Sequence, residues 1–220
     1  MNIEDQIKTF QKLYNVSRET IDLLSLYHSL LLEEQQKVSL VGSGTLKNIW
    51  LRHFADSAKL VERIIQHSKK IKKPVNICDA GSGAGFPGIV CLLLLSERGS
   101  KISMSLIESS SKKCKFLGLV KKELKLPFLV VNKRIEESRQ KFDLILSRAL
   151  APLSILLKLL ADLGGGKSIL LLPKGKNWLK EVNEAKKIWY FSYNAVKNNR
   201  ILDNSGGVTL EIKGLRPKKN

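Results

Sequence analysis

An acid followed by closely spaced glycines is the stretch of this sequence best suited to chemistry. Asp79 ends a short apolar run that begins at Val75. Four glycines follow at nearly alternate positions: Gly81, Gly83, Gly85 and Gly88. Glycine permits positive φ in a tight turn and lets a ligand lie directly against the backbone. The segment 83–88 also satisfies the G-x-G-x-x-G pattern of dinucleotide-binding proteins. The spacing therefore predicts a loop that binds a nucleotide-like cofactor.

Further charged residues take equivalent positions along the chain. Each lies at or just past the end of a short apolar run: Glu108, Glu136, Arg148 and Lys174. The carboxyl ends of parallel strands meet at one edge of an open α/β sheet, and ligands bind there. We therefore expect these side chains to gather with Asp79 around a single site.

The sequence predicts the fold that positions these residues. It is an α/β fold with a mostly parallel, Rossmann-like sheet of about seven strands. Apolar runs predict strands at 75–78, 102–107, 128–131, 142–147 and 168–172, with two further candidates at 189–191 and 208–212. Helical patterns at 89–95, 116–124 and 153–163 lie between them, and three glycines at 164–166 are expected to lead into the fifth strand. This alternation of strand and helix is typical of a parallel sheet.

The first part of the chain reads as helical. Residues 1–73 are interpreted as a helical N-terminal extension and residues 74–220 as the Rossmann-like domain. Apolar residues recur at helical spacing near the N-terminus, and Ser17 is expected to cap a second helix. Another helix is expected from Thr45 to Gln66. It carries the segment Arg52-His53-Phe54-Ala55-Asp56-Ser57.

Two cofactors suit a glycine loop with an acid at the next strand end. Glu108 is suited to bind a ribose, which both NAD and S-adenosylmethionine contain. The Asp79 carboxylate repels a pyrophosphate but attracts the ammonium of a methionine group. The sequence therefore favours S-adenosylmethionine, with a nicotinamide-dependent oxidoreductase as the alternative.

The charge balance indicates a polyanionic partner. The 220 residues include 38 Lys and Arg against 20 Asp and Glu, a formal net charge of +18. Such a field attracts nucleic acid. A catalytically silent RNA-binding module is therefore a second alternative to an enzyme.

Cysteine content and hydropathy bear on the cellular compartment of the protein. The three cysteines form no C-x-x-C pair, which favours reduced thiols in the cytoplasm. The chain opens with acidic residues rather than a leader, and no apolar run reaches membrane-spanning length. We expect a cytoplasmic monomer without a membrane segment or a metal site.

Several motifs together resemble the bacterial small-subunit (16S) rRNA guanine-N7 methyltransferases, the RsmG or GidB family. The matching stretches are Arg52–Ser57, Asp79–Gly88, Arg134–Glu137, Phe142-Asp143, Ser147–Ala149 and Lys174-Gly175. The resemblance implies a class I methyltransferase sheet, S-adenosylmethionine as methyl donor, and a guanine in the 530 loop of small-subunit rRNA as substrate. The partner is then this RNA or an assembling 30S particle.

The family resemblance and the positions at strand ends together predict the site residues. The cofactor-binding set is Asp79, Gly81, Gly83, Gly85, Phe86, Glu108, Ile135, Glu136 and Arg148. Arg148 and His53 are the catalytic candidates, because each is expected to approach the cofactor and the target base. Arg52, Arg134 and Lys174 are the candidates for RNA contact.

The chain departs from the family pattern at three places. The family usually has Asn-Leu-Thr where Ser39-Leu40-Val41 stands here, and its second-strand acid is commonly Asp rather than Glu108. An Arg-His pair is usual where Gly206-Gly207-Val208 stands. These departures concern RNA contact more than the cofactor loop.

Overall fold

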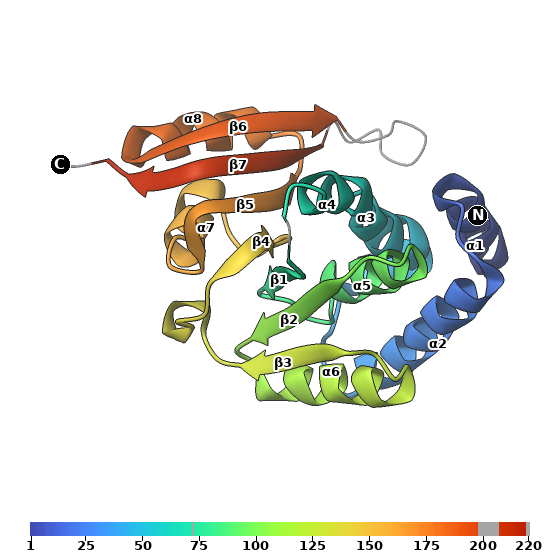
Figure 1. Cartoon of the computed structure of the whole chain (residues 1–220). Coiled ribbons are helices and arrows are strands. Elements are labelled where there is room, and N and C mark those ends of the chain that lie inside the picture. The colour runs from blue at the N-terminus through green and yellow to red at the C-terminus, as the bar shows by residue number, and fades with distance from the viewer. Residues whose placement is uncertain (72, 198–206, 219–220) are drawn as a thin grey trace.

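The computed structural model describes residues 1–71, 73–197 and 207–218 and has a seven-stranded sheet as its centre (Figure 1). The strands lie in the order β3-β2-β1-β4-β5-β7-β6. Their bounds are β1 Val75–Ala80, β2 Ile102–Glu108, β3 Phe128–Asn132, β4 Phe142–Leu146, β5 Gly164–Lys174, β6 Trp189–Lys197 and β7 Val208–Pro217. The first five pair in parallel, and β7 pairs antiparallel with both β5 and β6. The predicted α/β fold with its mostly parallel sheet is confirmed.

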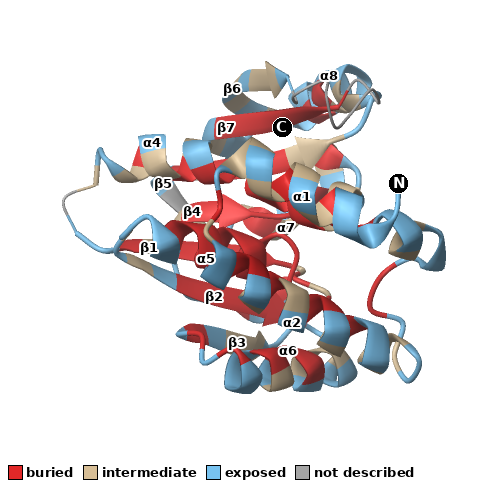
Figure 2. Ribbon diagram, turned by 90° about the vertical axis from the view of Figure 1, so that its right-hand side faces the viewer, coloured by how far each residue is buried: buried red, intermediate tan, exposed pale blue. Residues whose placement is uncertain are grey.

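Alternation along the central strands separates two hydrophobic cores, one on each face of the sheet. Ile77 and Leu144 belong to one cluster, whereas their chain neighbours Cys78 and Ile145 belong to the other. Successive side chains of a strand point to opposite faces. Both faces of the middle strands are therefore buried, which explains why these runs are almost uniformly apolar (Figure 2).

Helices cover both faces. The first core contains residues of α5 (Gly88–Glu97) and α6 (Ser111–Glu123), together with the N-terminal helices. The second contains residues of α7 (Leu153–Leu160) and α8 (Trp178–Ile188). No helix in the described ranges is long and apolar enough to span a membrane.

The N-terminal helices begin as predicted but continue differently. α1 (Ile3–Tyr14) and α2 (Arg18–Gln35) are capped by the side chains of Asn2 and Ser17. The single helix expected over 45–66 is wrong: the chain forms η1 (Ser43–Asn48), the π-turn η2 (Trp50–Phe54), α3 (Ala55–Ala58) and α4 (Val61–Ser68). The stacked rings of Trp50 and Phe54, with centroids 4.5 Å apart, are both fully buried. Trp50 also contacts the Phe10 ring of α1, and Phe54 contacts the Tyr27 ring of α2, so this segment packs against both N-terminal helices.

The fifth strand also differs from the sequence prediction. Gly164 already belongs to β5 and pairs with Phe142, so the glycines begin the strand rather than lead into it. Pairing with β4 inside the sheet supplies backbone hydrogen bonds that outweigh the low strand propensity of glycine. The two C-terminal strands are confirmed and are longer than predicted. Most of the predicted turn between them, 204–206, lies outside the described residues.

Candidate active site

The glycine loop after β1 has the backbone that its sequence predicts. Gly81, Gly83 and Gly85 have φ of 71°, 60° and 100°, values that favour glycine. A Cβ on Gly83 would meet no atom within 4 Å, so it would project into open space. The loop therefore leaves room above Gly83 for a ligand.

The amides of this loop are largely used within the protein. Gly81 and Ser82 donate to Ile107 O at 3.0 Å, and Gly85 donates to Ser82 O at 2.8 Å. At the start of α5, Gly88 N donates to the Asp79 carboxylate at 2.8 Å. A pyrophosphate needs free amides at this helix N-terminus. The arrangement therefore disfavours a dinucleotide.

Asp79 is completely buried beneath the loop. Burial raises its carboxyl pKa to about 6, although the Gly88 amide, the Ser82 hydroxyl and the nearby Arg148 cation lower it. Its Oδ1 has no hydrogen-bond partner among the described residues. Asp79 thus organises the start of α5 and still has one unused acceptor that would be stabilised by a neighbouring cation.

Glu108 lies at the rim of the same loop. Its Oε2 accepts from Gly83 N at 2.9 Å, and its Oε1 accepts from Ser110 N at 2.8 Å. Each carboxylate oxygen offers a second lone pair. The Glu108 carboxylate therefore fixes the loop and retains acceptor capacity for a ribose.

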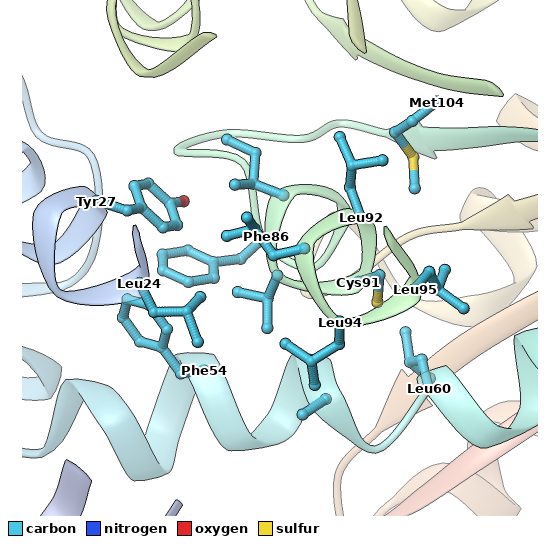
Figure 3. Packing of buried hydrophobic residues seen from close by; sticks show 14 of the residues in the cluster. Leu24, Tyr27, Phe54, Leu60, Phe86, Cys91, Leu92, Leu94, Leu95 and Met104 are labelled. Carbon is cyan, nitrogen blue, oxygen red and sulfur yellow. The ribbon is translucent and has the colours of Figure 1, made fainter. Parts of the chain in front are cut away.

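Tyr27 of α2 anchors the loop from the other side. Its buried ring lies tilted against that of Phe86, with centroids 5.3 Å apart (Figure 3). Its hydroxyl donates to Ala84 O. Phe86 itself turns away from solvent into this aromatic cluster, where only 4% of it is exposed. The sequence analysis missed Tyr27, because its place on an apolar helical stripe indicated only a core residue.

The two catalytic candidates, His53 and Arg148, are brought together. Arg148 Nη2 lies 2.6 Å from His53 Nδ1, and Nη1 donates to Arg52 O at 3.1 Å. The guanidinium also lies 5.4 Å from the centre of the Phe86 ring. Burial and the Arg148 and Arg52 cations lower the pKa of His53 to about 3. His53 is therefore a neutral hydrogen-bonding group and a weak base.

A cleft of about 780 Å³ lies beside the glycine loop, between η2–α3, the segment after β4, the tip of β5, and α8. Its cations are Arg52, Lys59, Arg148, Lys174 and Lys180. Its acids are Asp56, Glu181 and Glu184. Leucine and proline side chains complete the lining. A cleft of this size suits a nucleotide-sized group.

The segment 148–150 forms a common wall of the loop and the cleft. Arg148, Ala149 and Leu150 line the cleft. On the other side, a Leu150 methyl lies 2.8 Å from the position of a Cβ on Gly81. Ala149 has a positive φ of 53°, which turns the chain sharply between its neighbours. The sequence analysis did not predict a role for Ala149 or Leu150.

The remaining predicted residues are dispersed. Ile135 is buried in the short turn η3 (Ile135–Glu137). Glu136 in this turn and Arg134 just before it are exposed. This turn follows β3 at the edge of the sheet, and its residues do not line the cleft. Lys174 does line it, but its ammonium already donates to Ala151 O and Glu181 Oε2, each at 2.9 Å. Arg52 is exposed at the cleft.

The sheet order, the glycine loop and the strand-end acids define a Rossmann-like methyltransferase of class I. A solved structure with this fold is the citrinin polyketide synthase CMeT domain, with a TM-score of 0.53 and 15% identity over 76% of this chain and 53% of that one. A likeness at this identity concerns the fold alone.

Sequence comparison identifies the family. The model of the GidB family, rRNA small subunit methyltransferase G, matches residues 20–214. The protein of that name from Bartonella tribocorum is 38% identical over 205 residues, covering 92% of this chain and 91% of the relative. The one from Bartonella henselae is 35% identical over 219 residues, covering 98% and 97%. The chain belongs to the rRNA small subunit methyltransferase G family, so the resemblance seen in the sequence and its S-adenosylmethionine cofactor are confirmed.

The loop suits this cofactor on structural grounds as well. The open space above Gly83 is a cradle that a side chain would fill, and the unused Asp79 acceptor favours a nearby ammonium. The Glu108 carboxylate stands beside Gly83 for a ribose. These features fit S-adenosylmethionine better than a dinucleotide.

Proposed function

We propose that the protein methylates N7 of a guanine in the 530 loop of small-subunit rRNA. The observation that carries this proposal is the common wall 148–150, which touches the cofactor loop on one side and lines a cation-rich cleft on the other. A polyanion with one nucleotide in the cleft is thereby held next to a cofactor on the loop.

The cofactor contacts follow from the loop. We assign the ribose to Glu108 and the methionine ammonium to the field of Asp79. The rest of the cofactor is assigned to the loop Gly81–Gly85, whose open position is Gly83. Phe86 supports this loop through the aromatic cluster around Tyr27. Ile135 and Glu136 are assigned to the adenine end, since η3 follows the strand next to β2. When bound, S-adenosylmethionine supplies an electrophilic methyl group.

The state of His53 supports attack by N7 rather than by an amine. Guanine N7 carries a free lone pair, so its methylation requires no removal of a proton. Both ring nitrogens of His53 are engaged in hydrogen bonds, and its low pKa of about 3 makes it a poor general base. The protein's task is then to hold and orient the base, for which the planar Arg148 guanidinium is suited.

The substrate is proposed to be small-subunit rRNA, free or within an assembling 30S particle, and the enzyme a cytoplasmic monomer. The family name and the net charge of +18 support an RNA substrate. Arg52 and Arg134 remain the proposed exposed RNA contacts. Lys174 can contact RNA only in competition with its bond to Glu181.

The test is transfer of a labelled methyl group from S-adenosylmethionine to small-subunit RNA and to the isolated 30S particle, followed by mapping of the modified nucleotide. We expect one 7-methylguanine, revealed by strand cleavage after reduction and aniline treatment. Label at another atom would reject the N7 assignment, and absence of label from both substrates would reject the proposed substrate. A parallel thermal-shift titration with S-adenosylhomocysteine and NAD should stabilise the protein with the first ligand only.

A further inference from the structure

Arg148 is a half-buried cation that no carboxylate among the described residues pairs with. In the part of the chain that the structure describes, its guanidinium bonds only to the Arg52 carbonyl and the His53 ring. Asp56 and Asp79 stabilise its positive charge from a distance and make no hydrogen bond to it. Because Arg148 lines the cleft, this charge is available to a ligand there.

The hydrogen-bond chemistry fixes the state of His53. Arginine can only donate, so Nδ1 of His53 must present its lone pair to Arg148. The single ring proton then lies on Nε2, which is 2.7 Å from Thr45 Oγ1. The Thr45 hydroxyl in turn donates to Gly42 O at 2.7 Å. A directed chain thus runs from a backbone carbonyl of the N-terminal region to the guanidinium of Arg148.

The surroundings keep His53 neutral. The charged groups that act on it are Arg148 from the segment after β4 and Arg52 on the same turn. Asp56, on α3, acts on Arg148. The two arginines and burial oppose protonation of the imidazole. Its orienting bond to Arg148 therefore brings no negative charge to the guanidinium.

We infer that Thr45 and His53 are positioning residues that orient the Arg148 guanidinium while leaving its positive charge uncompensated for the RNA. This inference rests on the proposed function. A carboxylate in place of His53 would hold the same group equally well but would neutralise it. A neutral imidazole supplies direction alone, and the bond between Nε2 and Thr45 holds the ring in the orientation that faces Nδ1 to Arg148.

The pair His53→Asn and His53→Asp tests the inference. Both side chains place an oxygen acceptor near the position of Nδ1, and only one is charged. We expect His53→Asn to lose about threefold in single-turnover methyl transfer and His53→Asp to lose at least about thirtyfold, because an ion pair consumes the charge that RNA requires. The slope of RNA affinity against salt should fall by about 0.7–0.9 in His53→Asp and stay at the parent value in His53→Asn.

A second pair of variants, at Thr45, tests the hydrogen bond to His53 Nε2. Thr45→Val keeps the shape and removes the hydroxyl, so Nε2 loses its acceptor and the ring is less firmly oriented toward Arg148. We expect kcat to fall about three- to tenfold with KM for RNA nearly unchanged, and Thr45→Ser to restore kcat. Equal kcat for the Val, Ser and parent proteins would overturn the role of Thr45.

Cofactor binding separates this inference from the proposed function. All four variants should bind S-adenosylhomocysteine within about twofold of the parent, which also shows that they are folded. If the parent protein itself transfers no methyl group to small-subunit RNA, the proposed function fails. If the parent is active and His53→Asp equals or exceeds His53→Asn, the inference fails. If a His53 variant does not fold, the Thr45 pair decides.

Discussion

The cofactor loop and the neighbouring cleft lie side by side, yet they are built in opposite ways. The loop is made from consecutive residues whose polar groups are mostly satisfied internally, with Asp79 buried beneath it and Glu108 at its rim. The cleft is made from several separate parts of the chain, and its lining carries five cations against three acids, two of which pair with Lys59 and Lys174. A small, constant ligand suits the first construction, and a large polyanion suits the second.

The largest effect on cofactor binding is expected from a substitution in the glycine loop. Gly83→Val places a branched side chain in the open cradle at a φ of 60°, so affinity for S-adenosylhomocysteine should fall by at least about 100-fold. Gly99→Val is the matched control, since Gly99 has a φ of 66° and equally open surroundings after α5. Calorimetry should show normal binding for the control. Equal affinities for the two variants would remove Gly83 from the cofactor site.

The next effect concerns the acid at the rim. Removal of the Glu108 carboxylate by Glu108→Ala should cost about 1.5–3 kcal/mol of cofactor binding, because a charge-assisted pairing with the ribose is lost. Glu108→Gln keeps an acceptor and the side-chain shape, so its affinity should lie between those of Ala and the parent. Titration calorimetry measures all three. An unchanged dissociation constant for Glu108→Ala would leave Glu108 with only its bonds to Gly83 and Ser110.

A smaller effect depends on pH. The pKa of Asp79 is raised to about 6, so the folded protein binds this proton more tightly than the unfolded chain does. The stability that the bound proton contributes is lost as the pH rises through 6. A cofactor ammonium prefers the ionised form. S-adenosylhomocysteine affinity should therefore rise up to about tenfold between pH 5 and pH 7 and then level off. Fluorescence titration across this range checks it. Asp79→Asn should bind with no such slope, and an identical slope in that variant would assign the titration to another group.

The smallest effects distinguish cations of the cleft. Arg52→Ala should lower the salt slope of RNA binding by about 0.7–0.9, because one exposed phosphate contact is lost. Lys174→Ala should change that slope less and lower the melting temperature more, because Lys174 already pairs with Glu181. RNA binding at several salt concentrations and thermal melts give both values. The opposite ranking would mean that the Lys174 ion pair opens for RNA.

The same contrast explains what the sequence could predict. The loop follows from local rules, namely an apolar strand, glycines at positive φ and a helix, and the Ser17 cap is equally local. Residues 45–66 form several short elements whose rings pack on distant residues, Trp50 on Phe10 and Phe54 on Tyr27, and no local pattern reveals these contacts. The bond between His53 and Arg148 joins residues 95 positions apart. The residue types of His53 and Arg148 suggested a site. The distance between the two side chains and the tautomer of His53 depend on the fold.

Arg148 is where the two regions meet, and single-turnover methyl transfer by Arg148→Lys tests that claim most directly. Lysine keeps the charge and loses the planar fork that bonds to His53 and Arg52. The account predicts a rate at least about tenfold below the parent, or about 1.4 kcal/mol at the transition state, with S-adenosylhomocysteine affinity within about twofold. A parent-like rate in both Arg148→Lys and Arg148→Ala would contradict it.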